Sequence, residues 1–513
     1  MITLKHMKNK NNDVFEQRTI KNIATLKGGD KFLEHVKIVR KAQPGPVIFT
    51  ISNGYGMVDA VIKDSDFNVD DIVEILGYVN ERAGKLQIEI EKIRKSDIDF
   101  DSIISKNSEP NNTSFSIESE RLEKLRPYFY NISKRIRRAI LENQPIMIRH
   151  HSDSDGINAG LAIEYSCKLL MEEIGANPEY NLFRSPSRAP FYDITDAFRD
   201  IVLIKKVIEG HGQKKPLIIV LDNGSTPEDI FGLKTMKSMG FEIIVVDHHN
   251  PVVIENKKTS VDPYLSLHLN PYIEGLDSQT CAGMLAYELG TWICENYSNP
   301  SLPAVAGITD RSNIKEADDY IKNSKKTKKE LEEIGIAIDF IAYQLKFNSG
   351  HGLFEELYTN PELVRIINEE IRKGVRTQLE STLPYLRTQD IDGIILSTID
   401  LEKYTMKFTY PAPGKVVSMI HDTVVIDRES LPVITLGHLS DMIIVRANKP
   451  VLPVDKIIEK LKKDIPHAHI SGGGHECAGA IKFTPAHLHE IIQNIKRQAK
   501  EINYEEENKK EDL

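Results

Sequence analysis

Hydrophobic and polar residues alternate over several short runs in the first hundred residues of the chain. Alternation with a period of two is typical of half-buried β-strands, and glycine-containing turns separate these runs. Five such strands in about sixty residues predict a small closed barrel over residues 30–95. The predicted strands are Val36–Val39, Val47–Ile51, Gly56–Ile62, Ile72–Gly77 and Leu86–Ile90.

The order of these strands resembles a nucleic-acid-binding OB fold, chiefly in Val73–Val79 followed by Gly84–Ile88. OB folds bind single strands through aromatic stacking and a basic groove. Phe49, Tyr55 and Tyr78 are the candidates for stacking, and the alternative is that they belong to the barrel core.

The pattern changes after a polar, turn-rich linker at residues 96–117. From residue 118 to residue 345, strand-like and helix-like segments alternate, which predicts a parallel sheet. Residues 346–387 read as a helical connector, and residues 388–500 as a smaller α/β domain. The predicted fold class is therefore α/β, with an N-terminal β-barrel preceding the parallel-sheet domain.

Three short apolar runs in the predicted sheet end in side chains of the kind that bind metals. Ile146–Ile148 leads into a segment with His151, Asp153 and Asp155, and Leu217–Leu221 ends at Asp222. The third run, Ile243–Val246, continues into Asp247, His248 and His249. Strands of an open α/β sheet deliver active-site residues at their carboxyl ends. Several carboxylates at one edge repel each other, so we expect divalent cations to compensate them.

Each of these motifs also has a structural interpretation. Asp153 and Asp155 would face one side of an extended segment, with Gly156 allowing a turn into a helix that begins near Asn158; the alternative is a simple capping turn. Asp222 alone could equally be a turn residue. The Asp-His-His triplet has no obvious packing purpose, and imidazole among oxygen ligands favours Mn²⁺ or Mg²⁺. Asp310 adds one more carboxylate far along the chain.

The whole-chain properties narrow the class of protein. The 513 residues predict two to four domains, and the net charge of −9 weighs mildly against nonspecific coating of nucleic acid. The polar segment Met1–Asp13 lacks the apolar core of a signal peptide, and no apolar stretch reaches the length of a membrane span. The four cysteines show no C-x-x-C spacing. We therefore expect a cytoplasmic protein with no membrane partner.

Taken together, the motifs resemble the DHH phosphoesterase superfamily, and within it the RecJ-like nucleases. The resemblance covers roughly residues 118–495, and the barrel at the start of the chain is similar to the order in archaeal RecJ-like proteins. The matching segments are His151–Gly156, Asp222, Asp247–His249, Asp310 and, in the family's associated C-terminal (DHHA1-like) domain, Gly472–His475.

This resemblance implies a site for two divalent cations, Mn²⁺ before Mg²⁺, with Asp222 bridging them. The implied metal ligands are Asp153, Asp155, Asp222, His248 and Asp310. His151 is implied to be a ligand or an acid/base group, and His249 and Asp247 complete the catalytic set. The implied substrate-binding residues are Arg446, Gly472, Gly473, Gly474 and His475.

The resulting functional hypothesis is a metal-dependent exonuclease that hydrolyses single-stranded DNA or RNA to mononucleotides with an activated water. The alternative within the superfamily is a small-substrate enzyme that acts on oligoribonucleotides, cyclic dinucleotides or pAp. A third possibility is an inactive replisome scaffold, which the complete ligand set argues against. Single-stranded nucleic acid is the expected partner, together with a helicase or replisome protein. Cleavage polarity and the choice between DNA and RNA stay open.

Overall fold

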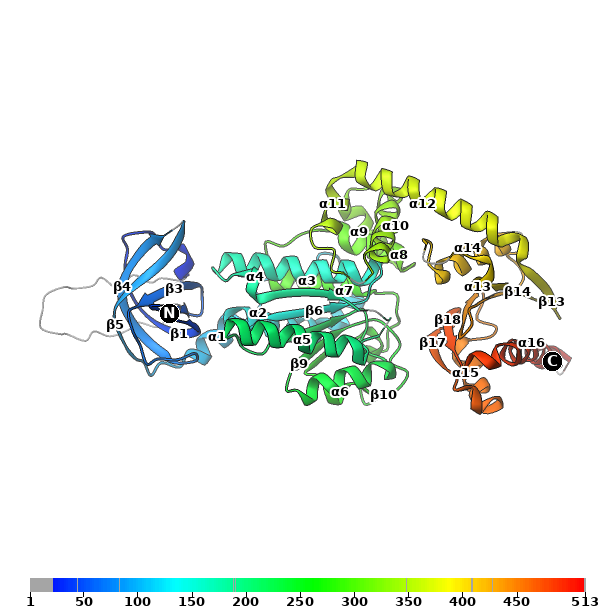
Figure 1. The fold of residues 1–513 in the computed structure, drawn as a ribbon, viewed down its shortest axis with the longest axis horizontal. Helices are drawn as coiled ribbons and strands as arrows, with labels where there is room; N and C mark the ends of the chain where they lie inside the picture. Colours follow the sequence, from blue (N-terminus) through cyan, green and yellow to red (C-terminus); the bar gives the residue numbers. More distant parts are fainter. Residues whose placement is uncertain are drawn as a thin grey trace, which may run out of the picture. The chain divides into compact units, whose positions relative to one another are not determined.

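The computed structural model describes residues 22–511, apart from residues 44, 83, 188, 190, 347, 407, 408 and 427. It does not describe the side chains of residues 207–211, 475 and 502–511. The polar leader Met1–Asp13 lies outside the described residues. The chain forms two compact units, Met1–Gly335 with Phe347–Gly350, and Ile336–Lys346 with His351–Leu513. Each unit is described by itself (Figure 1).

The first unit begins with a closed five-stranded barrel in the order β1-β2-β3-β5-β4. β3 and β5 pair in parallel, and the other neighbours pair antiparallel. Alternate residues such as Phe32, Val36 and Ile75 fill the interior, so the predicted barrel is confirmed. Its strands are β1 (Lys31–Ala42), β2 (Val47–Ser52), β3 (Met57–Ile62), β4 (Ile72–Arg82) and β5 (Lys85–Lys95).

The aromatic candidates for stacking divide between the core and the surface. Phe49 is fully buried, so it belongs to the barrel core and is not a stacking residue. Tyr55 and Tyr78 are 43% and 38% exposed. Only these two of the three proposed rings are accessible to a ligand.

The barrel contacts the carboxyl-terminal end of α3 (Ser154–Glu173). The Met57 amide donates to the carbonyl of Ile174 over 2.6 Å. Gly175 has a φ of 77°, and a Cβ there would lie 2.5 Å from the carbonyl oxygen of Met57. Glycine is therefore required where the barrel meets the end of this helix.

A five-stranded parallel sheet in the order β12-β9-β8-β6-β7 forms the body of the first unit. Its central strands are buried along their whole length, as expected for a sheet covered on both faces. Residues of α5 and α6 pack with β6, β8 and β9 in one core on one face, and α3 lies against β6 and β7. The sheet strands are β6 (Ile146–His150), β7 (Leu182–Pro186), β8 (Leu217–Leu221), β9 (Glu242–Val246) and β12 (Leu267–Leu269).

The helices around this sheet include two that position the site, α7 (Ala282–Ile293) and α8 (Ser301–Thr309). A two-stranded ribbon, β10 (Ile254–Glu255) and β11 (Lys258–Thr259), lies outside the sheet. The other helices of the first unit are α1 (Phe100–Asn107), α2 (Glu120–Leu141), α4 (Pro178–Asn181), α5 (Ile194–His211), α6 (Ile230–Ser238) and α9 (Lys315–Ser324). A further helix, α10 (Lys328–Leu345), begins in the first unit and continues into the second. No helix in the described part of the chain is both long and apolar enough to cross a membrane.

The second unit carries a six-stranded mixed sheet in the order β13-β14-β15-β16-β18-β17, which confirms the predicted C-terminal α/β region. Its strands are β13 (Arg387–Ile391), β14 (Ile394–Asp400), β15 (Val433–His438), β16 (Met442–Ala447), β17 (Ser471–His475) and β18 (Ala478–Lys482). Its helices are α11 (Leu353–Thr359), α12 (Pro361–Thr382), α13 (Leu401–Tyr404), α14 (Pro413–Ile426), α15 (Val454–Asp464) and α16 (Leu488–Glu511).

Candidate metal centre

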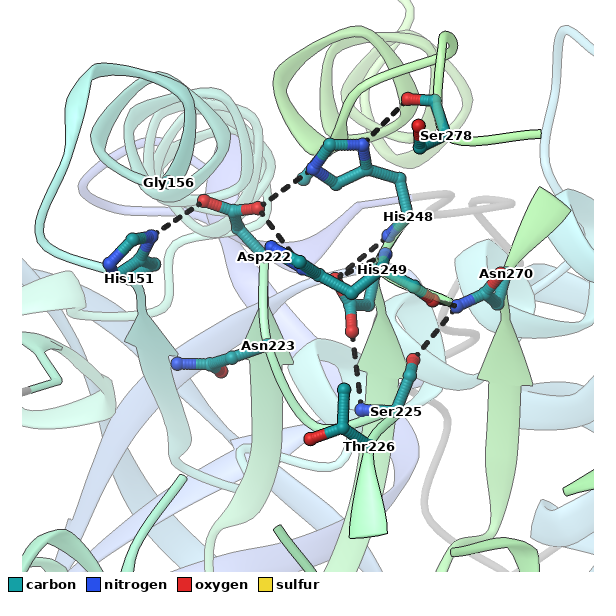
Figure 2. Close-up of polar contacts among 12 residues, drawn as sticks. His151, Gly156, Asp222, Asn223, Ser225, Thr226, His248, His249, Asn270 and Ser278 are labelled. Atoms are coloured by element: carbon teal, nitrogen blue, oxygen red, sulfur yellow. Dashed lines mark hydrogen bonds and ion pairs between the residues drawn. The ribbon is translucent and has the colours of Figure 1, made fainter. Parts of the chain in front are cut away.

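The carboxyl ends of β6, β8 and β9 bring the three sequence motifs to one edge of the sheet (Figure 2). The backbone hydrogen bonds of the sheet continue past the ends of the strands. The His151 amide donates to the Leu221 carbonyl, and the Asp222 amide donates to the Val246 carbonyl. Asp222 adopts a left-handed conformation with a φ of 57°. This conformation costs of order 1 kcal/mol or more in a residue other than glycine, and it is typical of functional sites.

Asp153 and Asp155 lie at the start of α3, which begins at Ser154 and not near Asn158 as the sequence suggested. Asp153 caps the helix by accepting a hydrogen bond from the Gly156 amide over 3.0 Å. Gly156 serves close packing, because a Cβ there would lie 2.4 Å from the carbonyl oxygen of His151. Asp153 is therefore the helix cap and Asp155 lies in the first turn, and not in an extended segment. The capping hydrogen bond starts α3 within the His151–Gly156 motif.

The start of α7 holds the carboxylate of Asp155. The Ala282 amide donates to Asp155 Oδ2 over 2.9 Å, and the Gly283 amide donates to Oδ1 over 2.8 Å. Amides at a helix N-terminus favour a negative charge. A Cβ at position 283 would lie 2.4 Å from the Ala306 Cβ and 2.9 Å from Asp155 Oδ1. Sequence reasoning missed this support, and its signal is the small-residue segment Cys281–Gly283 at the start of a helix.

Asp222 lies at the centre of the cluster and is almost completely buried. Its Oδ2 is 3.3 Å from His151 Nδ1, and its Oδ1 is 3.2 Å from His248 Nε2. These distances are within ion-pair range, but neither carboxylate oxygen has a partner with hydrogen-bond geometry in the described part of the chain. A buried carboxylate without a hydrogen bond needs a cation to offset its loss of solvation.

Two groups of potential metal ligands share this carboxylate. One consists of Asp222, His248 and His249, and the other of His151, Asp153 and Asp222, with the ligand atoms in each group within 4.8 Å of one another. Asp222 thus occupies the place that a carboxylate bridging two ions would take. The structure brings all these residues together as the sequence suggested, and their roles as ligands stay a proposal.

His248 is oriented with one nitrogen toward the carboxylates. Its Nδ1 lies 2.7 Å from the carbonyl oxygen of Ser278 and must donate to it, so the proton is on Nδ1 (Figure 2). Nε2 faces Asp222 at 3.2 Å and Asp155 at 3.6 Å, and although burial opposes it, these carboxylates and Asp310 raise the pKa of His248 well above its usual range. A bound metal ion would take the place of the Nε2 proton. Metal-binding histidines are held by such a second hydrogen bond. Ser278 is a further residue that the sequence motifs did not reveal.

Asp247 does not point into the cluster and instead organises the loop after β9. Its Oδ1 accepts hydrogen bonds from the amides of His248 and His249 and from His249 Nδ1, the last over 2.7 Å. Its Oδ2 accepts from the Ser225 amide. Burial opposes ionisation of this carboxyl, but His249 and these donors keep the pKa of Asp247 well below its usual range. The expected member of the catalytic set is therefore better described as a positioning residue.

Asp310 closes the cluster from the end of α8. Its Oδ2 lies 3.7 Å from His248 Nδ1. Burial raises the pKa of Asp310 to about 6, and the nearby carboxylates of Asp222 and Asp153 add to the shift. Burial and Asp222 likewise raise the pKa of Asp155 well above its ordinary value. The carboxylates are too crowded to be ionised together without added positive charge, and their oxygen and imidazole donors fit divalent ions such as Mn²⁺ or Mg²⁺.

The predicted substrate-binding residues all lie in the second unit, and the metal centre lies in the first. Gly472 and Gly474 are needed by the β17–β18 hairpin, because a Cβ at either position would lie 2.1 or 2.2 Å from a carbonyl oxygen of β18. Only Gly473 has open space at its Cβ position. Arg446 on β16 donates to Ser418 Oγ over 2.9 Å. The side chain of His475 is outside the described residues.

Comparison with known proteins identifies the family. The model of the DHH family, N-terminal domain, matches residues 145–308. An uncharacterized protein of Methanocaldococcus jannaschii, MJ1198, is 36% identical over 90% of this chain and 68% of its own length.

Similar solved structures include the following two. The DHH domain of a member of the s1p family of ribosomal proteins is 34% identical, with a TM-score of 0.75, over 78% of this chain and 96% of that one. RecJ from Thermus thermophilus in complex with Mn²⁺ is 15% identical over 76% of this chain and 56% of that one, with a TM-score of 0.49, a likeness too distant to bear on function. The predicted resemblance is confirmed at the level of the family: this chain belongs to the DHH family of metal-dependent phosphoesterases.

Proposed function

We propose that this DHH protein is an exonuclease that hydrolyses single-stranded nucleic acid to mononucleotides at a two-metal centre. The observation that supports the chemistry is the position of Asp222. Its two buried oxygens face His151 and His248 without hydrogen-bond geometry in the described part of the chain, and the residue belongs to both ligand groups. Two ions held by such a carboxylate would stabilise the attacking and leaving oxygens of an in-line phosphoryl displacement and would lower the pKa of bound water. Mn²⁺ is the proposed ion, with Mg²⁺ as the alternative.

The protein's own residues hold this centre in a defined state. The Ser278 carbonyl fixes the tautomer of His248, and the amides of Ala282 and Gly283 fix the Asp155 carboxylate. Asp247 accepts the Nδ1 proton of His249, so Nε2 is the nitrogen of His249 that can accept a proton or a hydrogen bond. We assign His151 to the ligand set, because its ligand atom lies within 4.8 Å of those of Asp153 and Asp222. We assign His249 to the scissile phosphate, because Asp247 already holds its Nδ1.

The barrel supports a polymeric substrate. The metal centre lies at the start of α3 and the barrel contacts its end, so the 20 residues of this helix separate them. At 1.5 Å per residue the separation along the helix is about 30 Å. At 3.4 Å per stacked nucleotide, a strand of roughly nine nucleotides is needed to span it. A substrate of one or two nucleotides would not use the barrel.

The test is digestion of single-stranded DNA and RNA oligonucleotides of about 20 nucleotides, more than twice the length needed to reach the barrel, labelled separately at each end, with Mn²⁺ present. We expect labelled mononucleotide to appear at once from one end only, which also gives the polarity and the sugar preference. Internal fragments from both labels would contradict exonuclease action. Turnover of dinucleotides or pAp without digestion of the long strands would assign the protein to the small-substrate class. No turnover of any substrate would favour a scaffold.

A further inference from the structure

A second group of metal-type side chains lies in the other unit, at the ends of the glycine-rich hairpin. His467 lies in a short 3-10 helix before β17, His487 follows β18, and Glu490 is in the first turn of α16. One ligand atom from each lies within 4.8 Å of the other two. His487 Nδ1 is 3.1 Å from Glu490 Oε2, and His467 Nε2 is 3.9 Å from the same oxygen.

We propose that these three residues bind a Zn²⁺ ion that is separate from the DHH metal centre. Zinc accepts two imidazoles, one carboxylate and a water in tetrahedral geometry. With bonds of about 2.0–2.1 Å, the ligand atoms of such a site lie about 3.3 Å apart. The distances of 3.1 and 3.9 Å bracket this value, and the two histidine ligand atoms lie within 4.8 Å of each other, so rotations of the side chains would complete the site.

An ordinary ion pair accounts for only part of this arrangement. His487 and Glu490 are three residues apart on neighbouring turns, where exposed pairs are common and contribute little stability. His467 comes from a different segment, and 62% of its side chain is exposed, so packing does not hold it there. Its ring nevertheless lies 4.6 Å from that of His487, centroid to centroid. The β17–β18 hairpin brings the two segments together, and at this point two imidazoles and one carboxylate face one another.

The ion would join the two ends of the hairpin. The Thr484 amide donates to the Ala468 carbonyl over 2.9 Å, so the backbones before β17 and after β18 are already connected. Between these ends lie Gly472, Gly473 and Gly474, whose backbone loses more freedom on folding than other residues do. Zn²⁺ would reduce the freedom of this segment, and its three protein ligands would leave one coordination position open to water.

The experiment counts Zn²⁺ bound per chain of the full-length, chelator-treated protein. We expect His487→Ala to bind one Zn²⁺ fewer than wild type. His489→Ala removes an exposed histidine two residues away on α16 and should leave the count unchanged. Asp222→Asn should lower binding at the DHH centre and retain this ion, so failure of the proposed nuclease site is distinguishable from failure of the zinc site.

Cobalt gives a second readout that separates the two kinds of site. Co²⁺ in a tetrahedral site absorbs visible light much more strongly than in a six-coordinate, oxygen-rich site. We expect this absorption in wild type and in Asp222→Asn, and its loss in His487→Ala and in the nearly isosteric Glu490→Gln. An unchanged Zn²⁺ count in His487→Ala, or a spectrum that Glu490→Gln does not alter, would overturn the proposal.

Discussion

At the scale of single residues, the metal centre is a group of buried carboxylates arranged at a cost to the fold. Asp222 combines a left-handed backbone with two buried oxygens that lack hydrogen bonds within the described residues. Burial and neighbouring carboxylates raise the pKa of Asp155 and Asp310. Functional sites commonly trade stability for reactivity in this way. The metal-free protein should therefore be less stable than a variant in which the central charge is removed.

Asp222→Asn tests this directly. In chelator, we expect the free energy of unfolding of the variant to exceed that of wild type by an amount on the order of 1–3 kcal/mol, because repulsion is relieved. Added Mn²⁺ should stabilise wild type and have much less effect on the variant. Thermal unfolding with and without metal measures both. Asp247→Asn is the control, because Asp247 accepts four hydrogen bonds and its variant should lose stability. A wild type more stable than Asp222→Asn without metal would contradict the account.

At the scale of elements, the start of α7 is as important to the site as the strands. Gly283 allows this helix to approach Asp155 and α8 closely. Gly283→Ala should destabilise the protein by about 1–3 kcal/mol through overpacking and weaken Mn²⁺ binding. Gly414→Ala in α14 is the matched control, since nothing lies within 4 Å of its Cβ position and alanine favours a helix. Equal stability of the two variants, with equal Mn²⁺ affinity, would show that Asp155 does not depend on this contact.

The barrel contains a glutamate whose pKa is shifted by burial. Glu34 on β1 lies opposite the buried Ile75 of β4 in the sheet. Burial raises the pKa of Glu34 to about 7 from an ordinary value of 4.5. The folded state then binds more protons than the unfolded state between these values, so stability falls as pH rises from about 4.5 through 7. Glu34→Gln should remove this dependence, worth on the order of 1–3 kcal/mol. Thermal unfolding from about pH 4.5 to 8 measures it, and parallel curves for the two proteins would contradict the assignment.

The elements also show what the sequence could predict. The strands of the parallel sheet and the residues that follow them could be located, because buried strands are short apolar runs and their carboxyl ends share an edge. The first turn of α3 could not be located from the sequence. It depends on the hydrogen bond from the Gly156 amide to Asp153, which the pattern of apolar and polar residues does not reveal. The amides of Ala282 and Gly283 and the carbonyl of Ser278 are contributed by the backbone. A search for ligand side chains does not detect them.

At the scale of the whole molecule, the proposed function assigns substrate binding to the barrel and cleavage to the metal centre at the other end of α3. Tyr78→Ala should weaken cleavage of strands longer than roughly nine nucleotides by about 5- to 160-fold in kcat/KM and leave shorter ones unchanged, because base stacking contributes about 1–3 kcal/mol. Leu33→Ala, which removes an exposed side chain without a ring from the same barrel, is the control. Rates measured over a series of lengths give the result. Equal loss on short and long strands would mean that the barrel only supports the fold.

The role of Asp222 in a two-metal site is tested by the initial rate of mononucleotide release from a labelled single strand, measured with Mn²⁺ for wild type and Asp222→Asn. We expect the variant to keep its folded thermal transition and to lose at least about a thousandfold in rate, or roughly 4 kcal/mol of transition-state stabilisation. A folded variant whose rate stays within about tenfold of wild type would contradict an Asp222-centred two-metal site.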